Sequence, residues 1–261
     1  MGLMSSSEDR PMTTATVDSV SERILQIEGS PNIRHIGGYA TRDGRRTSTD
    51  LVRSASLHRL QPGGIAVLRD HGVRTVVDLR SKIERERDVT PSLEEHGIAH
   101  VFAPVFEQEA SPVGLASEQF VGYGVVYQRM LTIGGDAYRA LFQTIAQSEG
   151  GLLFHCAVGK DRTGVAAMLM LELAGVADEE IVADYAASAE LLRPLLAAML
   201  PRMAERGISA ERGIAMMDSP REAIETTLAH LRAQYGSAAG YLHDLGFEGG
   251  EISAVKRRIV E

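Results

Sequence analysis

Cysteine is nearly absent from this chain, which has one among its 261 residues. A single cysteine cannot form an intramolecular disulfide, so the fold gains nothing from an oxidising environment. This favours a reducing cytoplasm, while secretion without a signal peptide stays open. The N-terminus has no apolar segment, and no run of about 18 apolar residues occurs anywhere, so the sequence predicts neither a signal peptide nor stable membrane insertion.

An excess of basic residues is also missing. The formal net charge is −8, which argues against nucleic acid or an anionic membrane surface as a bulk electrostatic partner. An acidic protein that binds an anionic substrate needs a local basic field instead. The candidates for that field are Arg34, Arg80, Lys160 and Arg162.

Internal linkers and repeats are lacking as well. Residues 1 to about 20 are polar, rich in Ser and Thr and without periodicity, which predicts a disordered arm. From residue 21 to 261 no Pro/Ser-rich segment divides the chain, and its 44% hydrophobic content is enough for one large core. We therefore expect a single domain over residues 21–261.

Apolar patterns predict alternating strands and helices. Short apolar runs predict strands over 23–27, 51–55, 73–79, 98–102 and the residues that lead to His155, and helical periodicity predicts helices over about 62–71, 117–131, 135–147 and 163–174. The run over 73–79 is continuous and β-branched, as in a strand covered on both faces. These patterns predict a three-layer α/β/α fold with a mainly parallel sheet of four to five strands.

The most informative segment joins a strand to an apolar helix and reads His155-Cys156-Ala157-Val158-Gly159-Lys160-Asp161-Arg162-Thr163-Gly164. A phosphate dianion needs several converging donors, and a tight loop at a helix N-terminus supplies backbone N–H groups together with the positive end of the helix dipole. Arg162 adds a planar fork that suits two phosphate oxygens. We assign phosphate binding to Ala157, Val158, Gly159, Lys160, Asp161 and Arg162.

Cys156 lies at the start of this loop, where the same donors favour a nucleophilic thiolate. The nucleotide-binding loop G-x-x-x-x-G-K-[ST] is excluded, because Phe154 and Asp161 occupy two of its defining positions. The histidines and carboxylates show no ligand spacing, so we predict no metal and no cofactor. His155 is then an orienting residue, and we give Thr163 the same role.

The segment resembles the signature of the Cys-dependent phosphatases, which is His-Cys, five residues, Arg and Ser/Thr. Its ending is similar to that of the atypical bacterial tyrosine and phosphoinositide phosphatases. A second block is similar to the N-terminal half of that group in order and spacing, and it comprises residues 32–39, 43–44, 53–54 and 76–81. Two residues depart from the pattern: His35 stands where the group usually has Asp, and Ile33 where it usually has Phe.

The resemblance spans about residue 32 to the C-terminus. It implies a protein-tyrosine-phosphatase-like fold and metal-independent hydrolysis through a phosphocysteine intermediate. The implied substrates are phosphotyrosine and also phosphoserine/phosphothreonine or phosphoinositides, with inorganic phosphate as the product. The rival hypothesis is a catalytically silent pseudophosphatase that only binds phosphorylated partners.

Several roles stay open at this point. The general acid that protonates the leaving group is either Asp161 in the loop or Asp78 at the end of a neighbouring strand. Lys160 either contacts extra phosphates at the pocket rim or neutralises the loop carboxylate, and Arg53 is either a structural ion-pair partner or a substrate ligand. Residues 188–217 resemble a helical lid over the pocket, with additional core helices as the alternative.

Overall fold

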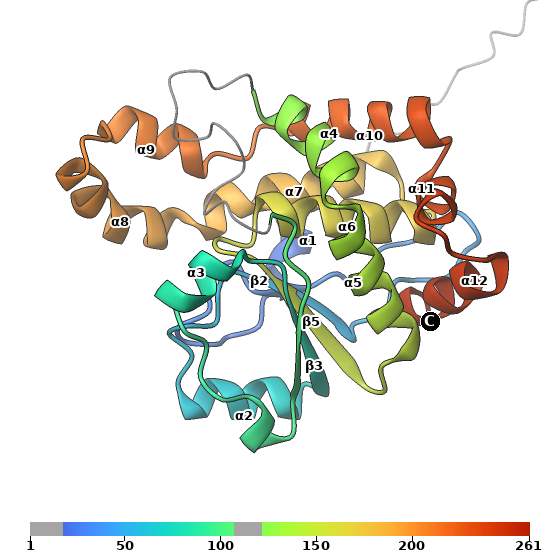
Figure 1. Cartoon of the computed structure of the whole chain (residues 1–261), viewed down its shortest axis with the longest axis horizontal. Helices are drawn as coiled ribbons and strands as arrows, with labels where there is room; N and C mark the ends of the chain where they lie inside the picture. The colour runs from blue at the N-terminus through green and yellow to red at the C-terminus, as the bar shows by residue number, and fades with distance from the viewer. Residues whose placement is uncertain (1–17, 107–121) are drawn as a thin grey trace, which may run out of the picture.

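A computed structural model describes residues 18–106 and 122–261 of the chain (Figure 1). Residues 1–17 of the arm expected to be disordered lie outside these ranges, as does most of the loop after Pro104 that we interpret as a possible cover of the site. The last part of the predicted arm already contains a short helix, α1 (Asp18–Ser21).

Five strands form one sheet in the order β1-β2-β5-β3-β4. Strand β1 pairs antiparallel with β2, and the remaining neighbours are parallel. The strands are β1 (Arg34–His35), β2 (Leu51–Ser54), β3 (Val73–Asp78), β4 (Ala99–Phe102) and β5 (Gly151–His155). The predicted sheet is confirmed, and its central strand β5 leads directly into the Cys156 loop.

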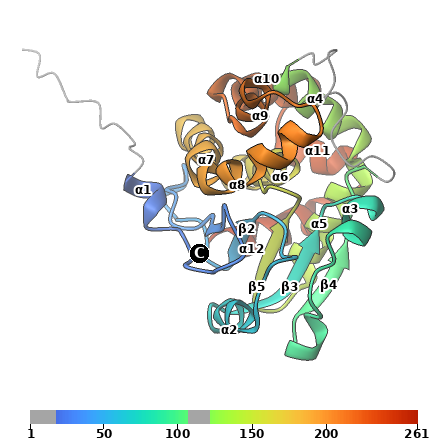
Figure 2. The same cartoon turned by 90° about the vertical axis from the view of Figure 1, so that its left-hand side faces the viewer.

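Helices cover both faces of this sheet, which confirms the three layers (Figure 2). Side chains alternate along a strand, so Leu153 of β5 faces one core while Phe154 faces the other. The smaller core holds the buried face of α2 (Pro62–Asp70) together with Leu93 and Ile98, which flank the 3-10 turn η1 (Glu94–His96). The larger core holds α4 (Tyr123–Ile133), α5 (Gly135–Gln147), α6 (Asp161–Ala174) and α12 (Gly249–Ile259).

Helix α6 is buried on nearly every side, since Glu172 is the one residue of the helix that is not fully buried, and its side chain is only 11% exposed. This matches its apolar sequence, which lacks the polar face of a surface helix. Gly175 ends it in the left-handed conformation, with φ of 84°. Because β5 and α6 are both fixed in the core, the loop between them has two immobile ends.

The remaining helices complete the outer layer and one projection. α7 (Asp178–Leu191), α10 (Arg221–Tyr235) and α11 (Ala238–Asp244) surround α6, and α3 (Lys82–Arg87) follows β3. α8 (Arg193–Glu205) and α9 (Ala210–Met217) extend from the body on the left of Figure 1. Within the described ranges, no helix combines the length and apolar character that a bilayer span requires.

Three local predictions were wrong. Residues 23–27 form no strand, because their apolar side chains pack into the smaller core while Ile24 makes only an isolated bridge. The sequence predicts that Pro194 and Pro201 break residues 191–214 into short helices, but Pro201 lies inside α8 and does not end it, since packing against α9 outweighs the local cost of a proline. Residues 219–222 have the spacing of a capping box and predict a helix start; α10 does begin after Pro220, but the Ser219 hydroxyl makes no capping bond.

Candidate active site

The loop between β5 and α6 is fixed through its backbone carbonyls. The backbone N–H of Ser56 donates to the Ala157 carbonyl at 3.0 Å. The Asn32 side-chain amide donates to the carbonyls of Val158 and Gly159, both at 3.0 Å. Three consecutive carbonyls of the loop therefore accept hydrogen bonds from residues that surround the loop.

This outward arrangement determines where the amide groups point. In a trans peptide the C=O and the following N–H point in opposite directions, and the described residues contain no cis peptide bond. The N–H groups of Val158, Gly159 and Lys160 therefore point to the inside of the loop. That is the donor arrangement of an anion-binding nest, and α6 begins directly after it.

Gly159 is required by this geometry. Its φ is +69°, and a Cβ at this position would lie 2.4 Å from the Ser54 carbonyl oxygen. No L side chain fits so close to a backbone atom. The glycine lets the loop lie directly on β2, where Arg53 also donates to the Gly159 carbonyl at 2.9 Å.

Arg162 is oriented by a buried carboxylate that we did not predict. Glu84 on α3 accepts from Nη1 at 2.6 Å and from Nη2 at 2.8 Å. Burial alone would raise the pKa of Glu84, but Arg162 outweighs burial and holds the pKa of Glu84 below its ordinary value. Glu84 also forms a capping box with Ser81, which fixes the carboxylate in place.

Glu84 occupies only the outer edge of the guanidinium. The Arg162 Nε has no hydrogen-bond partner among the described residues, although it is buried. A guanidinium has five N–H groups, so the edge formed by Nε and Nη2 keeps two of them for a ligand. A planar pair of donors of this kind matches two oxygens of a phosphate.

Asp161 lies at the first position of α6 and is nearly buried. Its Oδ1 accepts from the Tyr127 hydroxyl at 2.6 Å, and that hydroxyl lies 2.7 Å from the Tyr185 hydroxyl. Burial raises the pKa of Tyr127 well above its ordinary value, so the phenol stays protonated and donates. Asp161 thus has a fixed position beside the loop arginine.

Lys160 does not lie at a pocket rim. Its side chain is fully buried, and its Nζ donates to the carbonyls of Met216 at 2.9 Å and Asp218 at 2.7 Å. The ammonium also lies 4.1 Å from the centre of the Tyr123 ring and 3.4 Å from the Asp161 carboxylate. These contacts engage the ammonium in the interior, so they favour the interpretation that Lys160 neutralises the loop carboxylate over the one in which it contacts extra phosphates.

Arg34, another candidate for the basic field, and Arg53, a possible substrate ligand by its sequence, are both engaged in the interior. Arg34 donates to Asp184 Oδ1 at 3.0 Å, and Arg53 pairs with the second oxygen of the same carboxylate. Burial would raise the pKa of Asp184, but the two arginines lower it to about 2. Arg53 is therefore a structural ion-pair partner, and this buried group supports the loop from below through the Gly159 carbonyl.

Asp78 is engaged in a similar way. Arg80 donates to its two oxygens from Nε at 3.0 and 3.1 Å and from Nη2 at 2.7 Å. Burial would raise the pKa of Asp78, but His155 and Arg80 outweigh it and keep the pKa below its usual range. A carboxyl that stays ionised is a poor proton donor, and Arg80 is not available as a basic ligand.

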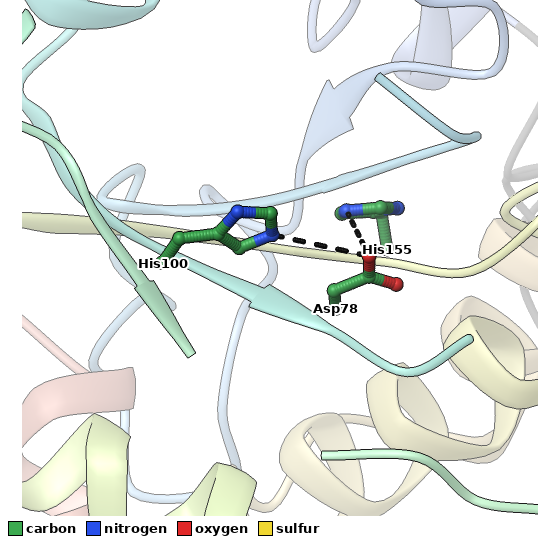
Figure 3. Close-up of side chains that lie close together, drawn as sticks. All are labelled: Asp78, His100 and His155. Atoms are coloured by element: carbon green, nitrogen blue, oxygen red, sulfur yellow. Dashed lines mark ion pairs between the residues drawn. The ribbon is translucent and has the colours of Figure 1, made fainter. Parts of the chain in front are cut away.

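His155 and Thr163 flank the loop in buried positions. The His155 Nδ1 lies 3.1 Å from the Cys156 carbonyl, which fits its predicted orienting role. Burial lowers the pKa of His155 to about 4, so the ring is neutral at pH 7. Thr163 Oγ1 has no hydrogen-bond partner within the described residues, and Figure 3 shows the other ring edge of His155 directed at Asp78.

The comparisons with known proteins agree with this geometry. The model of the tyrosine phosphatase family matches residues 25–261. The chain belongs to this family. A tyrosine-protein phosphatase of Nostoc commune is 32% identical over 216 residues, which cover 80% of this chain and 74% of that protein.

A second relative is the triple specificity protein phosphatase PtpB of Mycobacterium tuberculosis, which is 26% identical over 275 residues and covers 89% of this chain and 98% of that protein. Among solved structures, the core catalytic domain of the PP-IP phosphatase SIW14 from S. cerevisiae, in complex with citrate, covers 79% of this chain and 94% of that chain with 15% identity and a TM-score of 0.37. The family match and these phosphatase relatives make the chain a Cys-dependent phosphatase.

Two residues that support this phosphatase loop carried little sequence signal. The spacing Ser81-x-x-Glu84 is readable as a capping box, and it could have identified the start of α3. It gives no sign that the Glu84 carboxylate reaches Arg162, 78 positions away. Asp184 lies on α7 with no motif around it, so only the fold reveals its two arginine partners.

Proposed function

We propose that this protein hydrolyses phosphotyrosine through a phosphocysteine intermediate. The observation that carries the proposal is the set of loop N–H groups that point inward beside the free edge of Arg162. Donors fixed before the substrate arrives stabilise charge on the equatorial phosphate oxygens without reorganisation. The Cys156 sulfur stands at the start of this set, where it serves as the nucleophile.

The reaction proceeds in two displacements. The Cys156 thiolate attacks phosphorus, the bond from phosphorus to the phenolic oxygen breaks, and the carboxylic acid of Asp161 protonates the leaving phenolate. Water then attacks the phosphocysteine, the sulfur–phosphorus bond breaks, and Asp161 takes the proton of that water. Inorganic phosphate leaves and the thiolate is restored, so no metal ion and no redox partner takes part.

Asp161 is favoured over Asp78 as the acid by its contacts. The Asp161 carboxylate is next to Arg162 in the chain and receives one hydrogen bond from a neutral phenol. The Asp78 carboxylate is bonded at both oxygens by the charged Arg80. Protonating Asp78 would remove the carboxylate charge from a doubly bonded pair with Arg80, whereas protonating Asp161 would weaken only the longer contact of 3.4 Å with the Lys160 ammonium, which keeps its two carbonyl partners.

Helices α8 and α9 are proposed to cover the site as a lid. Loop residue Val158 packs against a small apolar cluster formed by these helices, which is separate from the two main cores. Its buried members are Leu192, Met203 and Met217. A cover held by so small a cluster and by Lys160 opens at lower cost than a segment of the main core.

The proposal is tested with the Cys156→Ser protein and a panel of phosphotyrosine, phosphoserine and phosphothreonine peptides and phosphoinositides, all assayed with a chelator present. We expect hydrolysis of phosphotyrosine by the wild type and a loss on the order of 10³-fold or more in the variant. Vanadate should still bind the variant, because the nest and Arg162 remain. A wild-type protein that binds phosphopeptides without turnover would establish the pseudophosphatase alternative.

A further inference from the structure

Three potential metal ligands converge on neighbouring strands beneath the loop. Asp78 ends β3, His155 ends β5 directly opposite it, and His100 lies on β4, where it pairs with Val76. Because side chains alternate along a strand, residues 76 and 78 face the same side, which brings His100 toward Asp78. One ligand atom from each of the three residues lies within 4.8 Å of the others.

Figure 3 shows both imidazole rings directed at the same carboxylate. The Asp78 Oδ2 lies 3.7 Å from His155 Nε2 and 3.9 Å from His100 Nε2. These separations exceed hydrogen-bond length, so direct histidine–aspartate bonds do not account for the arrangement. Both Nε2 atoms are buried and have no hydrogen-bond partner among the described residues.

The tautomer of His155 makes the cluster electron-rich. Its Nδ1 lies 3.1 Å from the Cys156 carbonyl oxygen, which is an acceptor, so the ring proton belongs on Nδ1. The Nε2 lone pair then faces the Asp78 carboxylate. A metal-binding histidine commonly donates its other N–H to a backbone carbonyl in this manner, which fixes the ring and its tautomer.

We propose that Asp78, His100 and His155 bind a divalent transition metal ion, with Zn²⁺ as the best match. Two imidazole nitrogens and one carboxylate oxygen form a ligand set that zinc accepts, with a water completing four-coordination. Zinc–ligand distances of about 2.0–2.1 Å place tetrahedral ligand atoms about 3.4 Å apart. The two histidine–carboxylate separations of 3.7 and 3.9 Å are close to this value, and the third separation, between the two histidine atoms, is at most 4.8 Å.

Arg80 opposes metal binding, because its positive charge lies beside the same Asp78 carboxylate and would repel a cation. It also fixes the orientation of that carboxylate through its bonds to both oxygens. Oδ2 accepts from Nη2 at 2.7 Å and shares the Nε proton with Oδ1 at 3.1 Å, so a metal ion on Oδ2 requires the Nε bond to remain on Oδ1 alone. The ion contacts the catalytic loop only through His155 and takes no part in the two displacements.

The experiment is isothermal titration of Zn²⁺ into the tag-free full-length Cys156→Ser protein. This background removes the thiolate, which would otherwise compete for zinc. We expect one Zn²⁺ per chain, and His100→Gln in the same background should weaken binding at least tenfold. His100 lies outside the catalytic machinery, so the single His100→Gln protein should retain phosphatase activity with chelator present.

His71→Gln is the matched control. His71 stacks on His35 with ring centres 6.1 Å apart, so this substitution removes another pair of histidines that could bind zinc. It should leave zinc affinity unchanged. A second readout needs no His100 variant: Zn²⁺ should shift the imidazole ¹⁵N resonances of two histidines in the Cys156→Ser protein. The proposal would be overturned if the protein did not bind zinc. It would also be overturned if zinc binding survived His100→Gln or was lost in His71→Gln.

Discussion

The two halves of the phosphate loop are fixed by different means. Residues 156–159 are fixed through backbone carbonyls, with donors from the segments around β1 and β2. Residues 160–162 are fixed through their side chains, whose partners lie on distant helices and on the segment after α9. The first half requires a glycine at position 159, because a side chain there would meet β2. The second half requires that each side chain of residues 160–162 contacts its particular partner. A substitution in one half should therefore fail in a different way from one in the other.

After loss of the nucleophile itself, the largest effect is expected in the backbone half, from Gly159→Ala. The added Cβ would lie 2.4 Å from the Ser54 carbonyl oxygen, so the loop must shift away from β2. Displacing preorganised oxyanion donors costs on the order of 10²–10³-fold in activity. We expect a loss of that size in kcat/KM for an aryl phosphate, with a parallel loss of vanadate affinity.

Gly44→Ala is the control for this substitution, since Gly44 also has a positive φ, of +84°, but has open space around its Cβ position. It should lower stability by about 1 kcal/mol through backbone strain and leave kcat/KM unchanged. Equal losses of activity in the two variants would show that strain alone, and not the contact with β2, governs the loop.

Asp161→Asn tests the side-chain half at its reacting group. An amide cannot protonate the leaving oxygen, so phenyl phosphate should be hydrolysed on the order of 10²-fold more slowly, while an activated ester should be affected far less. Asp78→Asn is the comparison, and its loss should be similar for both esters because it acts through the buried Arg80. Rates across a leaving-group series measure the difference, and a reversed ranking would move the acid role to Asp78.

Glu84→Gln should reduce kcat/KM about tenfold, because Gln keeps one acceptor for Arg162 but loses the paired charge. Breaking a buried ion pair from one side also lowers the free energy of unfolding, by about 3 kcal/mol. The matched control is Glu86→Gln on the same helix, whose carboxylate is exposed and lies 3.7 Å from Lys82 Nζ. That control should change neither quantity.

Acidification gives an independent check on Glu84. Its folded-state pKa is depressed, so its contribution to stability is present above the ordinary value of 4.5 and is lost as pH falls through the lower folded value. Denaturant titrations from about pH 5 to pH 3 should show a steeper loss in the wild type than in Glu84→Gln. Parallel curves would mean that Arg162 does not hold Glu84 in its ionised form.

This contrast also explains what the sequence can predict. The strands, the buried helix α6 and the loop that joins them follow from apolar runs and from the local order Gly159 to Arg162, so they are recognisable without a structure. Glu84 belongs to a charged stretch that is usually solvated, and nothing local marks its burial. The site formed by Asp78, His100 and His155 was missed for the same reason, since strand pairing and not sequence spacing unites the ligands.

Lys160→Met should have the smallest effect and separates the two interpretations of this lysine. Methionine fills a similar volume but cannot donate to the carbonyls of Met216 and Asp218, so the last turn of α9 and the residue that caps it lose one bond each. The loss of these two bonds should lower kcat/KM about threefold. This reduction should be equal for phosphotyrosine peptides and phosphoinositides at one ionic strength. Proteolysis within residues 193–217 should also become faster, whereas the exposed-site control Lys82→Met should change neither quantity. If phosphoinositide hydrolysis falls more than phosphotyrosine hydrolysis, the ammonium meets the substrate after all, and the buried contacts of Lys160 describe only the closed form of the site.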